Sequence, residues 1–213
     1  MIIEVCAESY EYAVKAVKAG ADRIELCKDL HLDGLTPDYE SAKRTIDTLN
    51  IPVFILIRPR EGDFIYSDKE FELMNRDIIK FKEMGCKGIV SGVLNDDNSI
   101  DIKRTKELVE LSRPLEFTFH RAFDIVSNPY KEIENLIESG IQRVLTSGQK
   151  KTAIDGIKLI KKLNKKYKNK IIIMPGGKIQ KKNIFYFKKC GIKELHGTFK
   201  NNINLNLKSY DKS

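Results

Sequence analysis

One sequence pattern limits the fold more than any other: four segments in which an amphipathic helix ends at a glycine that is followed by a short apolar strand. They read KAGADRIELC around Gly20, EMGCKGIVSG around Gly85, ESGIQRVLTSG around Gly140 and KCGIKELHGT around Gly191. Glycine adopts at low cost the left-handed backbone conformation that ends many helices. We therefore expect a helix-to-strand junction at each of these glycines.

Four further apolar strands lie between these junctions: IIEVC from Ile2, PVFILIRP from Pro52, PLEFTFHR from Pro114 and KIIIMPGG from Lys170. Helical apolar spacing is found in the intervening segments Glu11 to Lys18, Asp68 to Met84, Ile102 to Leu111 and Thr152 to Tyr167. Strand and helix thus alternate eight times, which predicts an α/β chain closed into a (β/α)8 TIM barrel. An open doubly wound sheet is the alternative, although no GxGxxG follows the first strand.

Length and composition agree with one soluble domain. The 213 residues suit a single core, and 41% hydrophobic with 32% charged residues is typical of a globular protein. The start of the chain does not read as a secretory signal, and no apolar run reaches the length of a membrane span. We therefore expect a cytoplasmic protein. The four cysteines form no CxxC pair, so they are expected to be reduced thiols.

The net charge of +8 is unevenly distributed along the chain. From Lys150 onward there are 18 Lys and only 3 Asp or Glu, a net charge of +15, whereas the first 149 residues carry −7. No aromatic residues are interleaved for base stacking, so the lysines are interpreted as a solvated face. Nucleic-acid binding through this region is the least favoured hypothesis.

The barrel geometry predicts which side chains share the interior at the carboxyl ends of the strands, where such barrels place their sites. On the first two strands, the alternation directs Glu4, Cys6, Glu25 and Cys27 inward. Aligning the repeat on its glycines places His196 at the level of Glu25, and Ser147 and Thr198 at the level of Cys27. Thr118 and His120 face inward on the fifth strand. Arg58 and Arg60 close the third strand, with Asp63 in its loop.

Two interpretations of these buried charges remain open. Buried carboxylates and guanidinium groups are costly unless they pair or bind a ligand. They could form an internal salt-bridge network of Glu4, Glu25 and Arg58, or they could belong to a binding or catalytic site. The loop Pro175, Gly176, Gly177 is either a phosphate-binding loop or a simple turn.

The cysteines also admit two interpretations. Cys6 and Cys27 end neighbouring strands, which lie about 4.8 Å apart in a sheet, and paired thiolates are suitable ligands for Cu(I). Packing as small apolar side chains is the alternative for both. Cys86 and Cys190 flank helix-ending glycines at the opposite face and are expected only to pack.

Read together, five motifs resemble the copper homeostasis protein CutC family: ADRIELC, GLTP, IRPREGDFIYSD, TFHRAFD and LTSGQ. The likeness runs from Ile2 to about His196. It implies a barrel fold, a cytoplasmic homodimer and copper binding, with Cys6 and Cys27 at the positions suggested for Cu(I) ligands. It also singles out a set of polar strand-end residues: Glu25, Arg58, Asp63, His120, Arg121, Asp124 and Gln149.

The chain departs from the family pattern at two places. Lys178 stands where the family usually continues its glycine run, which argues against a phosphate cradle. The C-terminal extension is reduced to NNINLNLKSYDKS. We therefore expect a barrel over residues 1–200 and a short polar tail over 201–213, with the final helix shortened or missing. Such a barrel would be completed by a partner subunit or left partly open.

Two functional hypotheses follow. The first is a copper homeostasis protein that binds Cu(I) at Cys6 and Cys27. The second is an enzyme for a small anionic substrate, a carboxylate or a phosphate, in which Arg58 and Arg60 clamp the anion and Glu25 and His120 exchange protons, with Asp124 as a third catalytic candidate. The remaining candidates for substrate binding are Asp63, Arg121, Ser147, Gln149, Gly176, Gly177 and His196.

Overall fold

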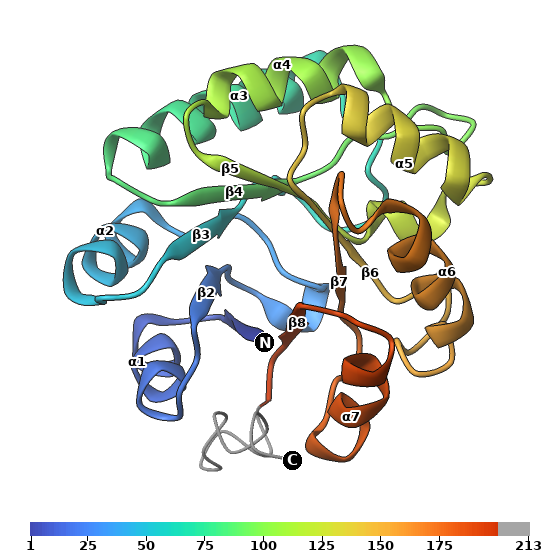
Figure 1. Cartoon of the computed structure of the whole chain (residues 1–213). Coiled ribbons are helices and arrows are strands. Elements are labelled where there is room, and N and C mark those ends of the chain that lie inside the picture. The colour runs from blue at the N-terminus through green and yellow to red at the C-terminus, as the bar shows by residue number, and fades with distance from the viewer. Residues whose placement is uncertain (200–213) are drawn as a thin grey trace.

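The computed structural model describes residues 1–199 and shows a ring of parallel strands surrounded by helices (Figure 1). The strands are β1 (Ile2–Ala7), β2 (Arg23–Leu26), β3 (Val53–Leu56), β4 (Gly88–Ser91), β5 (Glu116–Phe119), β6 (Arg143–Thr146), β7 (Ile172–Pro175) and β8 (Glu194–Gly197). The helices are α1 (Tyr10–Lys18), α2 (Tyr39–Thr48), α3 (Asp68–Glu83), α4 (Ile102–Ser112), α5 (Pro129–Glu138), α6 (Ile157–Tyr167) and α7 (Lys181–Lys189), with 3-10 turns η1 (Leu30–Leu32) and η2 (Arg121–Ile125).

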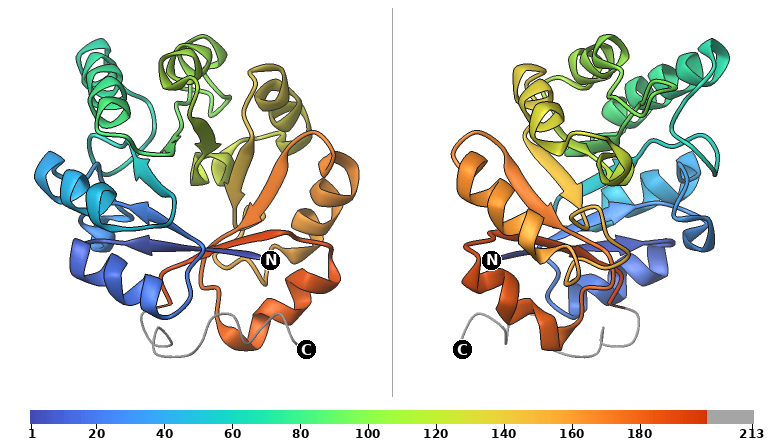
Figure 2. Two further views of the ribbon diagram at one scale, coloured as in Figure 1. Left: turned by 60° about the vertical axis from the view of Figure 1, so that its left-hand side comes forward. Right: turned by 90° about the vertical axis from the view of Figure 1, so that its right-hand side faces the viewer.

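The strands follow the order β7-β6-β5-β4-β3-β2-β1-β8 in one sheet, and every paired neighbour is parallel. β8 pairs with β1 in the register Glu4↔His196. β7 and β8, the two ends of the sheet, contact one another, so the barrel is nearly closed (Figure 2). This confirms the predicted (β/α)8 fold over the open sheet. The predicted tail and the expected loss of a final helix lie outside the described residues.

The glycine repeat explains the helix-to-strand junctions. Gly20, Gly85, Gly140 and Gly191 have φ angles of 98°, 91°, 77° and 71°. These are left-handed conformations that a side chain would strain. Each glycine follows the end of a helix and precedes β2, β4, β6 or β8. The prediction made from the repeat is therefore confirmed at all four positions.

Alternation along the strands separates two apolar layers. Ile3, Val5, Ile24 and Leu26 belong to the large core between the sheet and the helices. Inside the barrel a smaller cluster consists of Cys6, Cys27, Phe54, Leu56 and Val90. The side chains of β1 and β2 therefore face as the sequence predicts.

A layer of charged side chains fills the barrel interior beneath this cluster. We call Glu4, Arg23, Glu116, Arg143 and Glu194 the ionic layer. Arg23 binds Glu4 and Glu194, both at 2.5 Å, and Arg143 binds Glu194 at 2.7 Å and Glu116 at 2.8 Å. All except Glu116 are buried. The buried network thus exists, but its predicted members are only partly right. Glu4 belongs to it, Glu25 is connected to it only through His196, which lies 2.8 Å from Glu4 and 3.9 Å from Glu25, and Arg58 does not take part.

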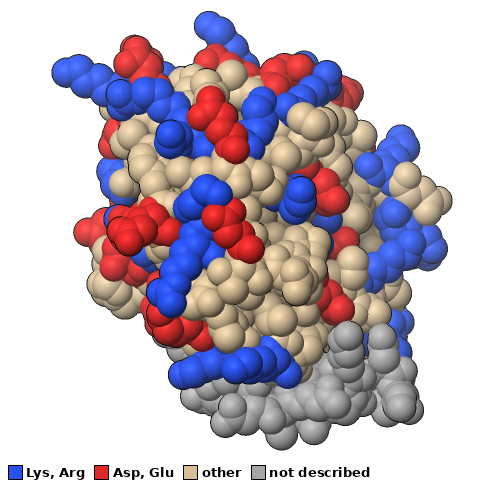
Figure 3. Space-filling model, turned by 90° about the vertical axis from the view of Figure 1, so that its left-hand side faces the viewer, with Lys and Arg blue, Asp and Glu red and all other residues tan. Residues whose placement is uncertain are grey.

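The described outer surface carries charges of both signs. Among the described residues, no helix is long and apolar enough to cross a membrane. Figure 3 shows Lys and Arg interspersed with Asp and Glu on one face of the molecule. In the lysine-rich part, Lys166 of α6 pairs with Glu134 of α5 at 3.1 Å. These contacts agree with solvated, mixed-charge helices.

Candidate functional site

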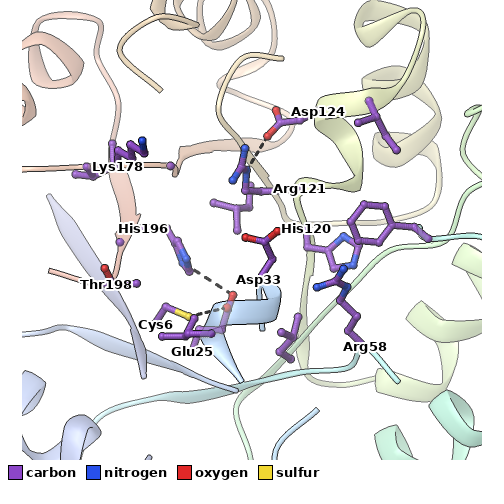
Figure 4. Close-up of a pocket in the computed structure, with 18 of the residues that line it drawn as sticks. Cys6, Glu25, Asp33, Arg58, His120, Arg121, Asp124, Lys178, His196 and Thr198 are labelled. Atoms are coloured by element: carbon purple, nitrogen blue, oxygen red, sulfur yellow. Dashed lines mark hydrogen bonds and ion pairs between the residues drawn. The ribbon is translucent and has the colours of Figure 1, made fainter. Parts of the chain in front are cut away.

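A pocket of about 450 Å³ opens at the carboxyl ends of the strands (Figure 4). The predicted site residues that line it are Cys6, Glu25, Arg58, His120, Arg121, Asp124, Gly177 and His196. They come from β1, β2, β8 and the segments that follow β3, β5 and β7. The predicted residues that do not line it are Cys27, Arg60, Asp63, Ser147, Gln149 and Gly176. Leu30, Asp33, Phe64 and Lys178 also line the pocket and were not among the predicted site residues.

Cys6, which lines the pocket, forms a sulfur pair with Cys27, which does not. The Sγ atoms of Cys6 and Cys27 lie 3.6 Å apart, and both side chains are buried. The Cys6 thiol lies 3.4 Å from Glu25 Oε1, and the Cys27 thiol lies 3.6 Å from the carbonyl oxygen of Ala7. The hydrogen bond with Cys27, burial and the charge of Glu25 raise the pKa of Cys6 well above its usual range. Cys6 is therefore a protonated thiol at neutral pH.

His196 joins the ionic layer to the pocket. Its Nδ1 lies 2.8 Å from Glu4 Oε1 and 3.9 Å from Glu25 Oε2. Burial opposes a charge on the ring, but Glu25 and Glu4 overcome this and raise the pKa of His196. Burial likewise opposes ionisation of Glu4, yet Arg23 and His196 lower its pKa to about 2. The two shifts together favour a protonated His196 imidazole beside an ionised Glu4 carboxylate.

Glu25 differs from Glu4 although the two carboxylates are on neighbouring strands. Burial raises the pKa of Glu25 and the charge of Glu4 adds to the rise, while His196 opposes it. One ligand atom from each of Cys6, Glu25 and His196 lies within 4.8 Å of the other two. Figure 4 shows these three side chains gathered on one side of the pocket. Such a group can hold a metal ion or exchange a proton with a bound molecule.

Arg58 and His120 occupy the other side of the pocket. The Arg58 guanidinium donates to the carbonyl oxygens of Leu32, Gly34 and Gly62 at 2.8, 3.1 and 3.0 Å. His120 Nδ1 accepts a hydrogen bond from the Ala122 amide at 3.2 Å. Burial and the charge of Arg58 lower the pKa of His120 to about 3. His120 is therefore neutral and carries its hydrogen on Nε2, because Nδ1 is an acceptor.

The low pKa of His120 makes part of the stability depend on pH. The unfolded chain protonates this histidine below its ordinary value of 6.5, whereas the folded chain does so only near about 3. The native protein should therefore lose stability as pH falls from 6.5, and a His120→Phe variant should lose about 2 kcal/mol less by about pH 5. Chemical denaturation at several pH values measures this difference. Parallel pH profiles for the two proteins would mean that His120 titrates normally.

The Asp124 carboxylate accepts several hydrogen bonds and so holds the loop after β6 in place. Its carboxylate accepts hydrogen bonds from Arg121 Nε at 2.8 Å, Thr146 Oγ1 at 2.5 Å, the Ser147 amide at 2.9 Å and the Gln149 amide at 3.2 Å. The Ser147 hydroxyl also donates to Asp124 at 2.8 Å, and the Gln149 side-chain amide donates to the carbonyl oxygen of Val126 at 2.5 Å, so neither side chain lines the pocket. The geometry indicates that Asp124 positions Arg121 and this loop.

Arg60 does not join Arg58. Its guanidinium binds Asp63 at 2.9 Å and Glu70 at 2.6 Å, and it lies over the Tyr66 ring at 5.2 Å. Arg60 and Asp63 therefore support the start of α3, outside the pocket. The expected clamp of two arginines is not formed. The reason is that β3 ends at Leu56, so the alternation of a strand no longer sets the direction of Arg60.

The CutC family model matches residues 1–201 of the chain. The chain belongs to the CutC family. It is 46% identical over 183 residues to the human copper homeostasis protein cutC homolog, covering 86% of this chain and 67% of that protein. It is 42% identical to a family protein CutC from Photorhabdus laumondii subsp. laumondii, covering 92% of this chain and 79% of that protein.

Solved structures agree with the family and with the fold. A crystal structure of CutC from Streptococcus agalactiae matches with a TM-score of 0.88 and 34% identity, covering 93% of this chain and 98% of that chain. An aldolase, QR15, matches with a TM-score of 0.72 but 12% identity, over 100% of this chain and 95% of that chain. The second likeness shows the barrel fold alone.

Proposed function

We propose that this CutC-family chain acts in copper homeostasis by binding Cu(I) between the thiolates of Cys6 and Cys27. The observation that carries the proposal is the 3.6 Å separation of two buried, reduced sulfur atoms at the functional end of the barrel. Soft thiolates select Cu(I) over the hard divalent cations. Cys86 lies in the core between the sheet and the helices, and Cys190 packs against that core. Neither forms a sulfur pair of this kind with a described residue.

The surroundings of the sulfur pair fit a bound cation. Cys6 faces the pocket, so an ion can reach it from solvent, and the His196 imidazole can supply a third donor once it has lost a proton. Glu25, 3.4 Å from Cys6 Sγ, offers an oxygen that can accept the thiol proton. If Cys6 and Cys27 served only to pack the barrel interior, apolar neighbours would be enough, and Glu25 and His196 would not be needed beside Cys6. We further propose that the protein works in the cytoplasm, where thiols stay reduced, and as the homodimer that the family resemblance implies.

Proton release tests the proposed Cu(I) site. The raised pKa of Cys6 means that the metal must displace a proton from this thiol. We expect Cu(I) binding to release at least one proton near neutral pH, so affinity should rise between about pH 6 and pH 8. Anaerobic competition with a chromogenic Cu(I) chelator measures this dependence. Affinity that stays constant, after correction for protonation of the chelator, would exclude the two thiols as ligands.

A further inference from the structure

We infer that the pocket also binds a small hydroxy acid, with its carboxylate between Arg58 and His120 and a hydroxyl group at Glu25. This goes beyond the Cu(I) proposal because it uses neither sulfur atom. It keeps the anionic ligand expected from the sequence but assigns it to a different pair of residues, since Arg60 lies elsewhere.

Three buried polar atoms in this pocket have no hydrogen-bond partner among the described residues. They are Arg58 Nε, on a guanidinium beside the Tyr66 hydroxyl, His120 Nε2, and Glu25 Oε2, which lies 3.9 Å from His196 Nδ1. A buried polar atom without a partner is costly, so native proteins leave few of them except where a ligand completes the bonding. Two of the three atoms are N–H donors and the third is a carboxylate oxygen. A ligand that satisfies all three needs an acceptor at one end and a donor at the other.

Arg58 supplies the positive charge for the acceptor end. Its side chain is 5% exposed, and it forms no ion pair with any residue in the described part of the chain. Three backbone carbonyls hold the guanidinium in place without neutralising it. The Tyr66 hydroxyl lies beside this guanidinium, but burial raises the pKa of Tyr66 to about 12, so Tyr66 is uncharged at neutral pH and does not neutralise Arg58. A buried, fixed cation without a counter-ion is the group that an anionic ligand would stabilise.

His120 adds a second, uncharged donor beside Arg58. Its ring packs against Phe64 with centroids 4.7 Å apart and against Phe119 at 5.9 Å, so the orientation of Nε2 is fixed. Figure 4 shows the His120 ring next to the Arg58 guanidinium. One positive charge with two N–H donors matches a carboxylate, which carries one negative charge and two acceptor oxygens.

The opposite side of the pocket favours hydroxyl groups. Glu25 and Asp33 both line it, and Figure 4 shows the Asp33 carboxylate entering the pocket between His196 and His120. Carboxylates accept hydrogen bonds from hydroxyls and repel a doubly charged phosphate. The pocket, about 450 Å³, falls in the size range of sites for small organic molecules. The combination selects a carboxylate that carries one or more hydroxyl groups.

Four probes test this assignment on metal-free, full-length protein: glycerate, propionate, glycerol and inorganic phosphate. Amide chemical-shift titrations give an apparent Kd for each. We expect glycerate to bind about tenfold or more tightly than the other three, because only glycerate offers both groups. The shifted resonances should include His120 and its neighbours. Phosphate binding as tightly as glycerate would overturn the carboxylate assignment, and no saturable binding of glycerate would overturn the site.

Variants then locate the binding groups. His120→Phe keeps the ring packing but removes the donor, and it should weaken glycerate about tenfold; Arg58→Met should weaken it further. Arg60→Met, outside the pocket, is the matched control and should leave the Kd unchanged. Unaltered glycerate binding in His120→Phe would overturn the proposal even if Arg58→Met fails to fold. Because copper is absent throughout, the outcome is independent of the Cu(I) proposal.

Discussion

Replacing both Cys6 and Cys27 with serine is expected to weaken Cu(I) binding by a hundredfold or more, on the order of the loss that follows removal of direct metal ligands. Serine has nearly the same size as cysteine, so the pocket should keep its shape. Its hydroxyl, however, is a hard donor that does not ionise at neutral pH. The loss should therefore reflect the missing thiolates and not a disturbed fold.

The remaining two cysteines provide the control. A Cys86→Ser/Cys190→Ser variant should bind Cu(I) as the native protein does, because Cys86 is buried in the outer core and burial raises the pKa of its thiol to about 11. Anaerobic chelator competition compares the three proteins, and circular dichroism verifies their folding. Equal affinities for the native protein and the Cys6→Ser/Cys27→Ser variant would place copper elsewhere or nowhere in the chain.

Removing Arg23 should cost about 3–5 kcal/mol of unfolding free energy, the range found when one partner of a buried ion pair is lost. Arg23→Met leaves Glu4 and Glu194 facing each other in the barrel interior without the cation that both bind at 2.5 Å. Glu4 is fully buried and its pKa is held at about 2 in part by Arg23. Equilibrium unfolding in urea at neutral pH measures the loss.

An exposed arginine is the matched control for this experiment. Arg113 pairs with Glu110 at 3.0 Å, but both side chains are more than 60% exposed, so Arg113→Met should change stability by less than about 1 kcal/mol. The ionised Glu4 also stabilises the native protein above its ordinary pKa of 4.5, and this contribution is lost as pH falls toward about 2. If Arg23→Met were no more destabilising than Arg113→Met, the ionic layer would not be a stabilising part of the fold.

Much of the architecture and half of the candidate site could be predicted from the sequence. The helix-ending glycines fix where β2, β4, β6 and β8 begin, and the period of two along each strand then sets the inward side chains. That reasoning brings Cys6, Glu25, His120 and His196 to one pocket, as the structure shows. It works because these residues lie on strands or directly after them.

The residues that were misplaced lie where these rules no longer hold. Arg60, Ser147 and Gln149 follow the ends of β3 and β6, where local hydrogen bonds set the side-chain direction. The ionic layer was missed for another reason. Arg23, Arg143 and Glu194 each stand three residues after a repeat glycine, so one signal could have found them together. These three residues lie one layer below the strand ends, where the predicted site residues were placed.

X-ray absorption at the copper edge of the Cu(I)-loaded protein reports the atoms bound to the metal. We expect sulfur neighbours contributed by Cys6 and Cys27, lost in the Cys6→Ser/Cys27→Ser variant and retained in Cys86→Ser/Cys190→Ser. A spectrum with only nitrogen and oxygen neighbours, or sulfur neighbours that persist in the Cys6→Ser/Cys27→Ser variant, would contradict the proposed Cu(I) site.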